Sequence, residues 1–306
     1  MENKPSLAVE ICGVKFKNPC IAASGTFGFG EEYQKYFPLN KLGGISVKGL
    51  TLLPRAGNPP PRIAETPSGM LNSVGLQNPG AEVFLSGHLP RLIESDTVVI
   101  ANIAGNTIED YCAMADTLSK SAVHMLELNI SCPNVKEGGV AFGTRPGLVL
   151  DVTRQVKAAS GDKPLIVKLS PNTADIRETA KAAEEGGADA LSLINTITGM
   201  MVDVKTMRPI LANVTGGLSG PAILPVALRM VFEACQAVDI PVIGMGGIMR
   251  GEDAAAFMLC GARAFMVGTA NIVSPTACVR ILSELERYLM EQGISDINAL
   301  VGALKV

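Results

Sequence analysis

The segment MLELNISCPN, residues 125–134, places a thiol where it could do chemistry. An apolar run ends near Cys132, Pro133 follows at once, and Asn129 and Asn134 stand three residues before and two residues after the cysteine. A small residue that stops a strand before a proline would explain Cys132 structurally. A thiol between two amides could instead accept a proton, because the thiolate is the reactive form of cysteine. Both interpretations stay open until the surrounding elements are placed.

Amide, hydroxyl and amine side chains stand at the ends of several other short apolar runs. Asparagine offers both a donor and an acceptor, so a group of asparagines is suited to binding a planar ring that carries amides. No histidine and no carboxylate stands at these run ends, which leaves the thiol of Cys132 as the ordinary candidate for a proton acceptor. The other polar positions are Ser24, Lys48, Asn102, Asn129, Lys168, Asn195 and Thr196.

Glycine turns follow the last two apolar runs, in GMGGI at 244–248 and VGT at 267–269, and GGLSGP at 216–221 adds a third. Glycine lets backbone N–H groups approach phosphate oxygens, and the loops after the seventh and eighth strands of a barrel commonly bind phosphate. A tight turn alone explains any one Gly-Gly pair. Three such turns together predict a phosphorylated ligand.

Two lysines, Lys48 and Lys168, end apolar runs. Either one could extend its ammonium group out of a barrel rim, and a lysine Schiff base is chemically possible. Two ammonium groups in a polar mouth that lacks carboxylates instead indicate an anionic ligand.

Strands and helices must position these side chains. The apolar runs are continuous rather than alternating, as in strands buried on both faces of a parallel sheet. Segments with helical spacing separate them, for example Leu148, Val152 and Val156 after Pro146. The alternation predicts an α/β fold, a single (β/α)8 TIM barrel over residues 1–306, with a doubly wound open sheet as the alternative. The eight runs are 20–24, 44–48, 98–103, 125–130, 165–169, 190–194, 241–245 and 264–268.

Several segments are additional to the eight strand–helix units of a minimal barrel. Residues 7–17 predict an N-terminal β-hairpin that turns at Cys12-Gly13 and could plug the bottom of the barrel. Residues 50–80, the glycine-rich stretch after Cys132 and residues 196–220 predict long loops after strands 2, 4 and 6. Long loops at the carboxyl ends of barrel strands are where such folds hold substrates.

Composition excludes several classes of protein. The 306 residues carry 26 basic and 29 acidic side chains, which argues against a nucleic-acid groove or a polybasic membrane patch. No apolar stretch approaches the roughly 18 residues that span a bilayer, and the first residues, MENKPSLAVE, lack a signal core. We therefore expect a cytoplasmic protein. Seven cysteines without C-x-x-C spacing argue against a disulfide framework or an iron–sulfur cluster in this chain, and two histidines argue against a histidine-rich metal site.

Nine stretches in chain order match one enzyme family: SGTFGFGEEY (24–33), SVKG (46–49), NSVGLQNPG (72–80), LNISCPN, IVKLSPN (166–172), LINT (193–196), GGLSGP, IGMGGI and VGT. Through them the chain resembles, over essentially its whole length, the dihydroorotate dehydrogenases of pyrimidine synthesis. The similarity is greatest to the catalytic subunit of the NAD-linked class 1B; the membrane-bound quinone class has an N-terminal extension and a serine in place of Cys132.

This resemblance implies a barrel that oxidises dihydroorotate to orotate in the de novo synthesis of UMP. Cys132 would take the C5 proton of the substrate while hydride passes from C6 to flavin N5, and Lys48 would face the substrate carboxylate. The substrate would be held by Lys48, Asn72, Ser73, Val74, Gly75, Leu76, Asn129, Asn134, Asn195 and Thr196.

The resemblance also implies one FMN per chain and no metal ion. Lys168 would stabilise negative charge on the reduced flavin. The FMN phosphate would be bound by Gly220, Gly246, Gly247, Gly268 and Thr269, and the flavin would be lined by Ser24, Lys48, Gly49, Asn102, Asn129 and Ile194.

A partner follows from the same resemblance. In the NAD-linked class a second subunit carries FAD and an iron–sulfur cluster, and this chain has neither a C-x-x-C pair nor a G-x-G-x-x-G after a strand. The implied assembly is a heterotetramer around a homodimer of barrels. Three alternatives stay open: the fumarate-linked class 1A enzyme, a dihydropyrimidine dehydrogenase, and a non-catalytic phosphate-binding barrel subunit.

Overall fold

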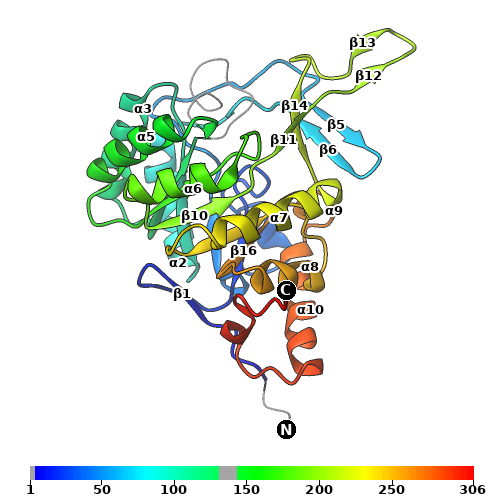
Figure 1. Cartoon of the computed structure of the whole chain (residues 1–306). Helices are drawn as coiled ribbons and strands as arrows, with labels where there is room; N and C mark the ends of the chain where they lie inside the picture. Colours follow the sequence, from blue (N-terminus) through cyan, green and yellow to red (C-terminus); the bar gives the residue numbers. More distant parts are fainter. Residues whose placement is uncertain (1–3, 131–142) are drawn as a thin grey trace.

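Eight parallel strands close into a barrel in the computed structural model, which describes residues 4–130 and 143–306 (Figure 1). The strand order around the barrel is β10-β15-β16-β3-β4-β7-β8-β9. The predicted barrel is confirmed and the open-sheet alternative is wrong, because the last strand pairs with the first, Phe265 opposite Cys20. The strands are β3 Cys20–Ala22, β4 Gly44–Ser46, β7 Val98–Ile103, β8 Met125–Asn129, β9 Leu165–Lys168, β10 Ala190–Leu193, β15 Val242–Met245 and β16 Ala264–Val267.

Burial explains why these strands read as continuous apolar runs. Every residue of the eight barrel strands is buried. One face of each strand fills the barrel and the other packs against the surrounding helices, so neither face selects polar residues.

Helices cover the barrel between most of the strands. The helices are α1 Ala81–Val83, continued by the π turn η3 Phe84–His88 and by α2 Leu89–Glu94, then α3 Ile108–Ser119, α5 Pro146–Ala159, α6 Ile176–Glu185, α7 Leu224–Cys235, α8 Gly251–Leu259, α9 Ala270–Val273 and α10 Ala277–Glu291. The first connection is an exception: two short 3-10 turns, η1 Tyr33–Lys35 and η2 Leu39–Lys41, replace a helix after β3. Pro38 separates these turns, and proline cannot continue a helix from within.

The buried side of α5 differs slightly from its prediction. Val152 and Val156 are buried as expected, but Val149 rather than Leu148 occupies the first turn of the buried stripe. Val149, Val152 and Val156 follow the spacing i, i+3, i+7, which lies on one face of a helix just as the predicted spacing i, i+4, i+8 does.

The predicted N-terminal hairpin is present as β1 Val9–Ile11 and β2 Val14–Phe16. Val9, Ile11 and Phe16 are buried. A Cβ on Gly44 would lie 3.0 Å from the Phe16 ring, so the hairpin packs at the point where β4 begins. Strand β4 enters the barrel there, and the hairpin therefore covers the amino-terminal end, away from the strand ends that carry the polar side chains.

The two long loops predicted after strands 2 and 6 contain β-strands. They pair with each other in a four-stranded antiparallel sheet of order β11-β14-β6-β5, the excursion sheet. Its strands are β5 Ile63–Thr66, β6 Gly69–Asn72, β11 Ile197–Gly199 and β14 Gly216–Ser219. Glycines at 216 and 217 permit this pairing, since a Cβ on Gly216 would lie 2.7 Å from the Asn72 carbonyl oxygen. The loop expected after strand 4 falls at 131–142, outside the described residues.

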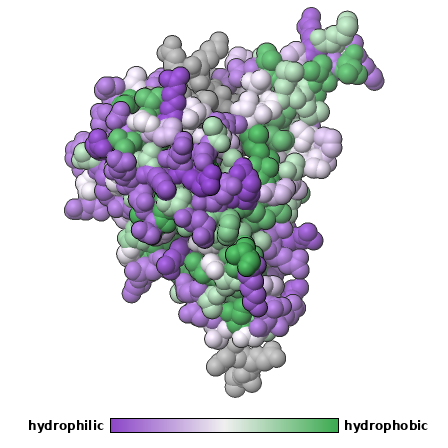
Figure 2. Space-filling model, in the orientation of Figure 1, coloured by the Kyte–Doolittle hydropathy of each residue, from purple (hydrophilic) through white to green (hydrophobic). Residues whose placement is uncertain are grey.

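A thin ribbon projects beyond the excursion sheet (Figure 1), formed by β12 Val202–Asp203 and β13 Arg208–Pro209. Val204 and Met207 are exposed on it. Polar side chains dominate the view over α5 and α6, whereas apolar ones gather over the excursion sheet (Figure 2). No helix within 4–130 and 143–306 is long and apolar enough to cross a bilayer.

Candidate active site

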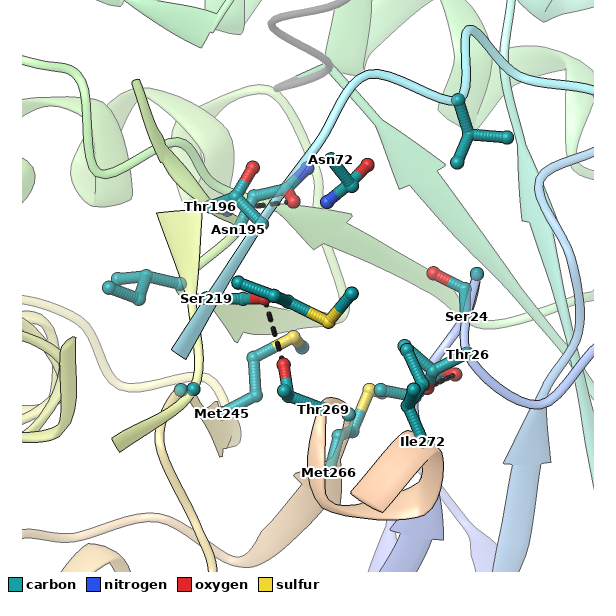
Figure 3. Close-up of a pocket in the computed structure, with 18 of the residues that line it drawn as sticks. Ser24, Thr26, Asn72, Asn195, Thr196, Ser219, Met245, Met266, Thr269 and Ile272 are labelled. Carbon is teal, nitrogen blue, oxygen red and sulfur yellow. Dashed lines mark hydrogen bonds between the residues drawn. The ribbon is translucent and has the colours of Figure 1, made fainter. Parts of the chain in front are cut away.

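A large cavity lies at the carboxyl ends of the barrel strands, under the excursion sheet (Figure 3). Each of the eight barrel strands contributes a lining residue from its end or from the residues that follow it, and β5, β6 and β14 contribute Ile63, Asn72 and Ser219. The cavity encloses about 1230 Å³ that no atom fills, part of it continuous with solvent. Barrel folds hold their ligands at this end, so the cavity is the candidate active site.

Nearly all of the predicted site residues that the structure describes lie on this cavity. Ser73 does not: it is fully buried, and its backbone N–H donates to the carbonyl oxygen of Arg62. Neighbouring residues of an extended chain face opposite sides, which is why Asn72 and Val74 border the cavity while Ser73 turns away. Cys132 and Asn134 lie outside the described residues. The residues on the wall are Ser24, Lys48, Gly49, Asn72, Val74, Gly75, Leu76, Asn102, Asn129, Lys168, Ile194, Asn195, Thr196, Gly220, Gly246, Gly247, Gly268 and Thr269.

Amides form one end of the cavity. Asn195 Nδ2 donates to Asn129 Oδ1 at 3.4 Å, and Asn129 Nδ2 donates to Asn102 Oδ1 at 3.3 Å. The register between β14 and β6, with Gly217 opposite Asn72, brings the fourth amide over the barrel. Asn72, Asn195 and Thr196 lie together on one side of the cavity in Figure 3. The chain thus gathers amides from three barrel strand ends and one excursion strand.

The two predicted lysines give the cavity its charge. Lys168 ends β9 and is 4% exposed, and its Nζ donates to Ser24 Oγ at 3.3 Å, so it does not extend from the rim into solvent. Lys48 also borders the cavity. Among the described lining residues there is no carboxylate. Two ammonium groups in such a wall favour an anionic ligand.

The glycine turns form the other end. Gly220, Gly246 and Gly247 have φ angles of +96°, +126° and +78°, a region that favours glycine. A Cβ on Gly268 would meet only Ala23 Cβ, at 3.8 Å, so it would project into the cavity. None of the hydrogen bonds formed within the described chain uses the N–H groups of Gly246, Gly247 or Thr269 as donors. Unused N–H groups beside a glycine cradle suit a phosphate.

Apolar side chains that the sequence analysis did not assign complete the wall. Met245, Met266 and Ile272 lie together on the side of the cavity opposite the amides (Figure 3). Met245, the last residue of β15, pairs with Met266, the next-to-last residue of β16, so both methionines lie at one level of the barrel. Methionine is soft and polarizable and packs well against aromatic rings. This apolar surface could have been predicted from the sequence, because a methionine stands near the end of each of the last two apolar runs.

Sequence reasoning also missed Glu127. It is 0% exposed on β8, two residues before Asn129, and its Oε2 accepts a hydrogen bond from Asn102 Nδ2 at 2.5 Å. The signal was an acid in the middle of the apolar run MLELNI. The described lining residues include no carboxylate, but one is buried directly behind the amides.

Comparison with known proteins decides the family. A sequence profile described as dihydroorotate dehydrogenase matches residues 6–289. The chain belongs to the dihydroorotate dehydrogenase family. Relatives named dihydroorotate dehydrogenase B (NAD(+)), catalytic subunit, are similar over nearly their full length. The protein of Thermoanaerobacter pseudethanolicus is 54% identical over 301 residues (98% of this chain, 99% of the relative). That of Geobacter metallireducens is 56% identical over 304 residues (99% of each chain).

Family membership fits the cavity as built. The matched range includes every lining residue from Ala23 to Ile272. A site for an oxidoreductase of this family must accommodate an anionic pyrimidine, and the described wall offers amides and ammonium groups for one. Groups of three or more histidine, cysteine or acidic side chains that could hold a metal do not occur in the described part of the chain.

Proposed function

We propose that this chain oxidises dihydroorotate to orotate in the de novo synthesis of UMP, with FMN bound in the cavity. One observation carries the proposal: a single cavity is lined at one end by amides and two lysines and at the other by glycine turns. The names of the relatives support the reaction and its link to NAD.

The glycine end fits the phosphate of FMN. Backbone N–H groups of Gly246, Gly247 and Thr269 would bind its oxygens, and Gly268 leaves the space that a larger side chain would fill. Ser24, Gly49, Asn102 and Ile194 would line the flavin ring. FMN bound there would supply the two-electron acceptor that this oxidation requires.

The amide end would bind and orient the substrate ring. Asn72, Asn129, Asn195 and Thr196 each offer donors or acceptors to the ring amides, and Lys48 would face the carboxylate. Cys132 would remove the proton at C5 of the substrate as a thiolate. Binding the ring beside this base would convert the proton transfer into a step within one complex, which would lower its entropic barrier.

The electrons would leave through a second subunit. The term catalytic subunit in the names of the relatives implies a separate electron-transfer partner. We propose that this partner carries FAD and an iron–sulfur cluster and passes the electrons to NAD. Two barrels would pair as a central homodimer, with one partner subunit on each.

An anaerobic titration tests the proposed function. The purified protein should show an oxidised-flavin spectrum that bleaches when dihydroorotate is added, with one flavin per chain. Dihydrouracil at the same concentration should leave the spectrum oxidised. Bleaching by dihydrouracil alone would indicate a dihydropyrimidine dehydrogenase, rapid turnover with fumarate would indicate class 1A, and a colourless protein that binds no FMN would favour a structural barrel subunit.

A further inference from the structure

Glu127 is a buried acid that the proposed reaction does not use. Its side chain points into the barrel, where it accepts hydrogen bonds from residues of three other strands. Ser46 Oγ and Asn102 Nδ2 donate to Oε2 at 2.7 and 2.5 Å, and Ser192 Oγ donates to Oε1 at 2.7 Å. All four residues are 0% exposed.

Glu127 forms no ion pair with any residue of the described chain. Taking a carboxylate out of water is costly unless hydrogen bonds satisfy it, and an apolar residue of similar volume would fill a barrel interior at lower cost. Glu127 is therefore a candidate for a role other than packing.

Asn102 connects Glu127 to the cavity through a chain of amides. Asn102 Oδ1 accepts from Asn129 Nδ2, and Asn129 Oδ1 accepts from Asn195 Nδ2. Asn195 Oδ1 in turn accepts from the backbone N–H of Thr196 at 2.8 Å. We call this series, from Thr196 through Asn195, Asn129 and Asn102 to Glu127, the amide relay. Every donor in the relay points toward Glu127.

The two ends of the relay fix its direction. A carboxylate can only accept hydrogen bonds and a backbone N–H can only donate one, whereas each amide between them could be turned by 180°. With an acceptor at one end and a donor at the other, a single direction makes all four hydrogen bonds of the relay. Reversing one amide would set two donors or two acceptors against each other, which a buried site penalises.

We propose that Glu127 is a positioning residue that sets the direction of the amide relay, and through it the donors and acceptors that Asn129 and Asn195 present to a planar ring carrying amides. The inference rests on the proposed function for the identity of that ring. Glu127 does not touch the ligand. Its role is to supply the acceptor at one end of the relay, opposite the Thr196 N–H at the other, so that the wall more strongly favours one arrangement of ring N–H and C=O groups.

The fixed amides have a second support behind them. The hydroxyl of Tyr111, a fully buried residue of α3, donates to the backbone carbonyl of Asn129 at 2.9 Å. The backbone of Asn129 is thus held by the helix layer while its side-chain orientation is held by the barrel interior. Loss of Glu127 would therefore change the orientation of the amide and leave its location unchanged.

The test compares three variants of the holoprotein as purified, by calorimetric binding of orotate and of orotate methylated at one ring nitrogen. Glu127→Met keeps the length of the side chain and removes the acceptor. Glu127→Gln keeps an acceptor for Asn102 in only one of its two orientations. Ser192→Ala is the matched control, because Ser192 donates to the other carboxyl oxygen and the relay keeps its terminus.

We expect Glu127→Met to bind orotate about tenfold more weakly, as for a buried amide that loses its partner. The preference for orotate over its methylated form should also fall, which a simple loss of packing would not cause. Glu127→Gln should recover part of both losses, and Ser192→Ala should retain the wild-type values. Thermal unfolding and FMN content establish that each variant is folded.

Wild-type affinity and preference in a folded Glu127→Met would overturn the inference. If that variant does not fold, Glu127→Gln decides, and equality with Ser192→Ala overturns the inference. Failure of the wild-type protein to bind orotate would instead contradict the proposed function, so the two failures are distinguishable.

Discussion

Six of the seven thiols lie in the described chain, and none of them borders the cavity. Burial raises the pKa of Cys12 to about 11 and that of Cys235 to about 12. A group with so high a pKa is protonated at neutral pH and is a poor proton acceptor. These thiols behave as small core residues, so the proposal of a catalytic thiol depends on Cys132 alone.

Cys132→Ala should bind FMN normally and lose most of its dihydroorotate oxidation. Removing a general base typically costs about 10²–10⁴-fold in rate, and stopped-flow reduction of the bound flavin measures it. The wild-type rate should rise with pH as the thiolate forms. Cys132→Ser should keep some activity, with its optimum at higher pH. A near-wild-type rate in Cys132→Ala would rule out this base.

Lys168→Ala should lower the reduction potential of bound FMN and slow its reduction. The side chain is buried in the cavity wall, where its ammonium group would stabilise negative charge more strongly than it would in water. Potentiometric titration measures the change, and Lys181→Ala, on the exposed face of α6, is the matched control. An unchanged potential together with an unchanged rate would place Lys168 away from the flavin.

Among the elements, the turn after β16 shows how a strand end makes a binding surface. Gly268→Val should fold but lose FMN, because its side chain would enter the cavity and meet little of the protein. FMN content, measured by absorbance, should fall well below one per chain. Gly147→Val is the control, since nothing lies within 4 Å of a Cβ at that position on α5. Full FMN content in Gly268→Val would exclude this turn from the cofactor site.

The barrel strands could be predicted from the sequence because a strand that is buried on both faces consists of consecutive apolar residues. The polar strand ends followed directly from that assignment, as Asn129 and Lys168 illustrate. The excursion sheet could not be predicted, because β6 and β14 are stabilised by pairing between segments about 145 residues apart, Asn72 with Gly217. Glu127 was missed for a related reason: its partners lie on β4, β7 and β10, and no local pattern indicates them.

For the molecule as a whole, electron transfer separates the proposed classes. The purified chain should reduce artificial dyes with dihydroorotate but reduce NAD poorly, because its own sequence lacks the motifs for an iron–sulfur cluster or a dinucleotide. Adding the electron-transfer subunit should restore NAD reduction, and size-exclusion chromatography with light scattering should detect a heterotetramer. Efficient reduction of NAD by this chain alone would contradict the need for a partner.

The pairing of β16 with β3 also sets an order of events during synthesis. Strand β3 emerges from the ribosome near the start of translation, but its neighbour on one side is made only after residue 264. The turns at 246–247 and 268–269 are also made late, so the proposed cofactor site is incomplete until residue 269 has been made. Until then the nascent protein presents the unpaired edge of a parallel sheet, a surface prone to association with other chains. Incorporation of FMN should therefore follow the synthesis of the turn after β16.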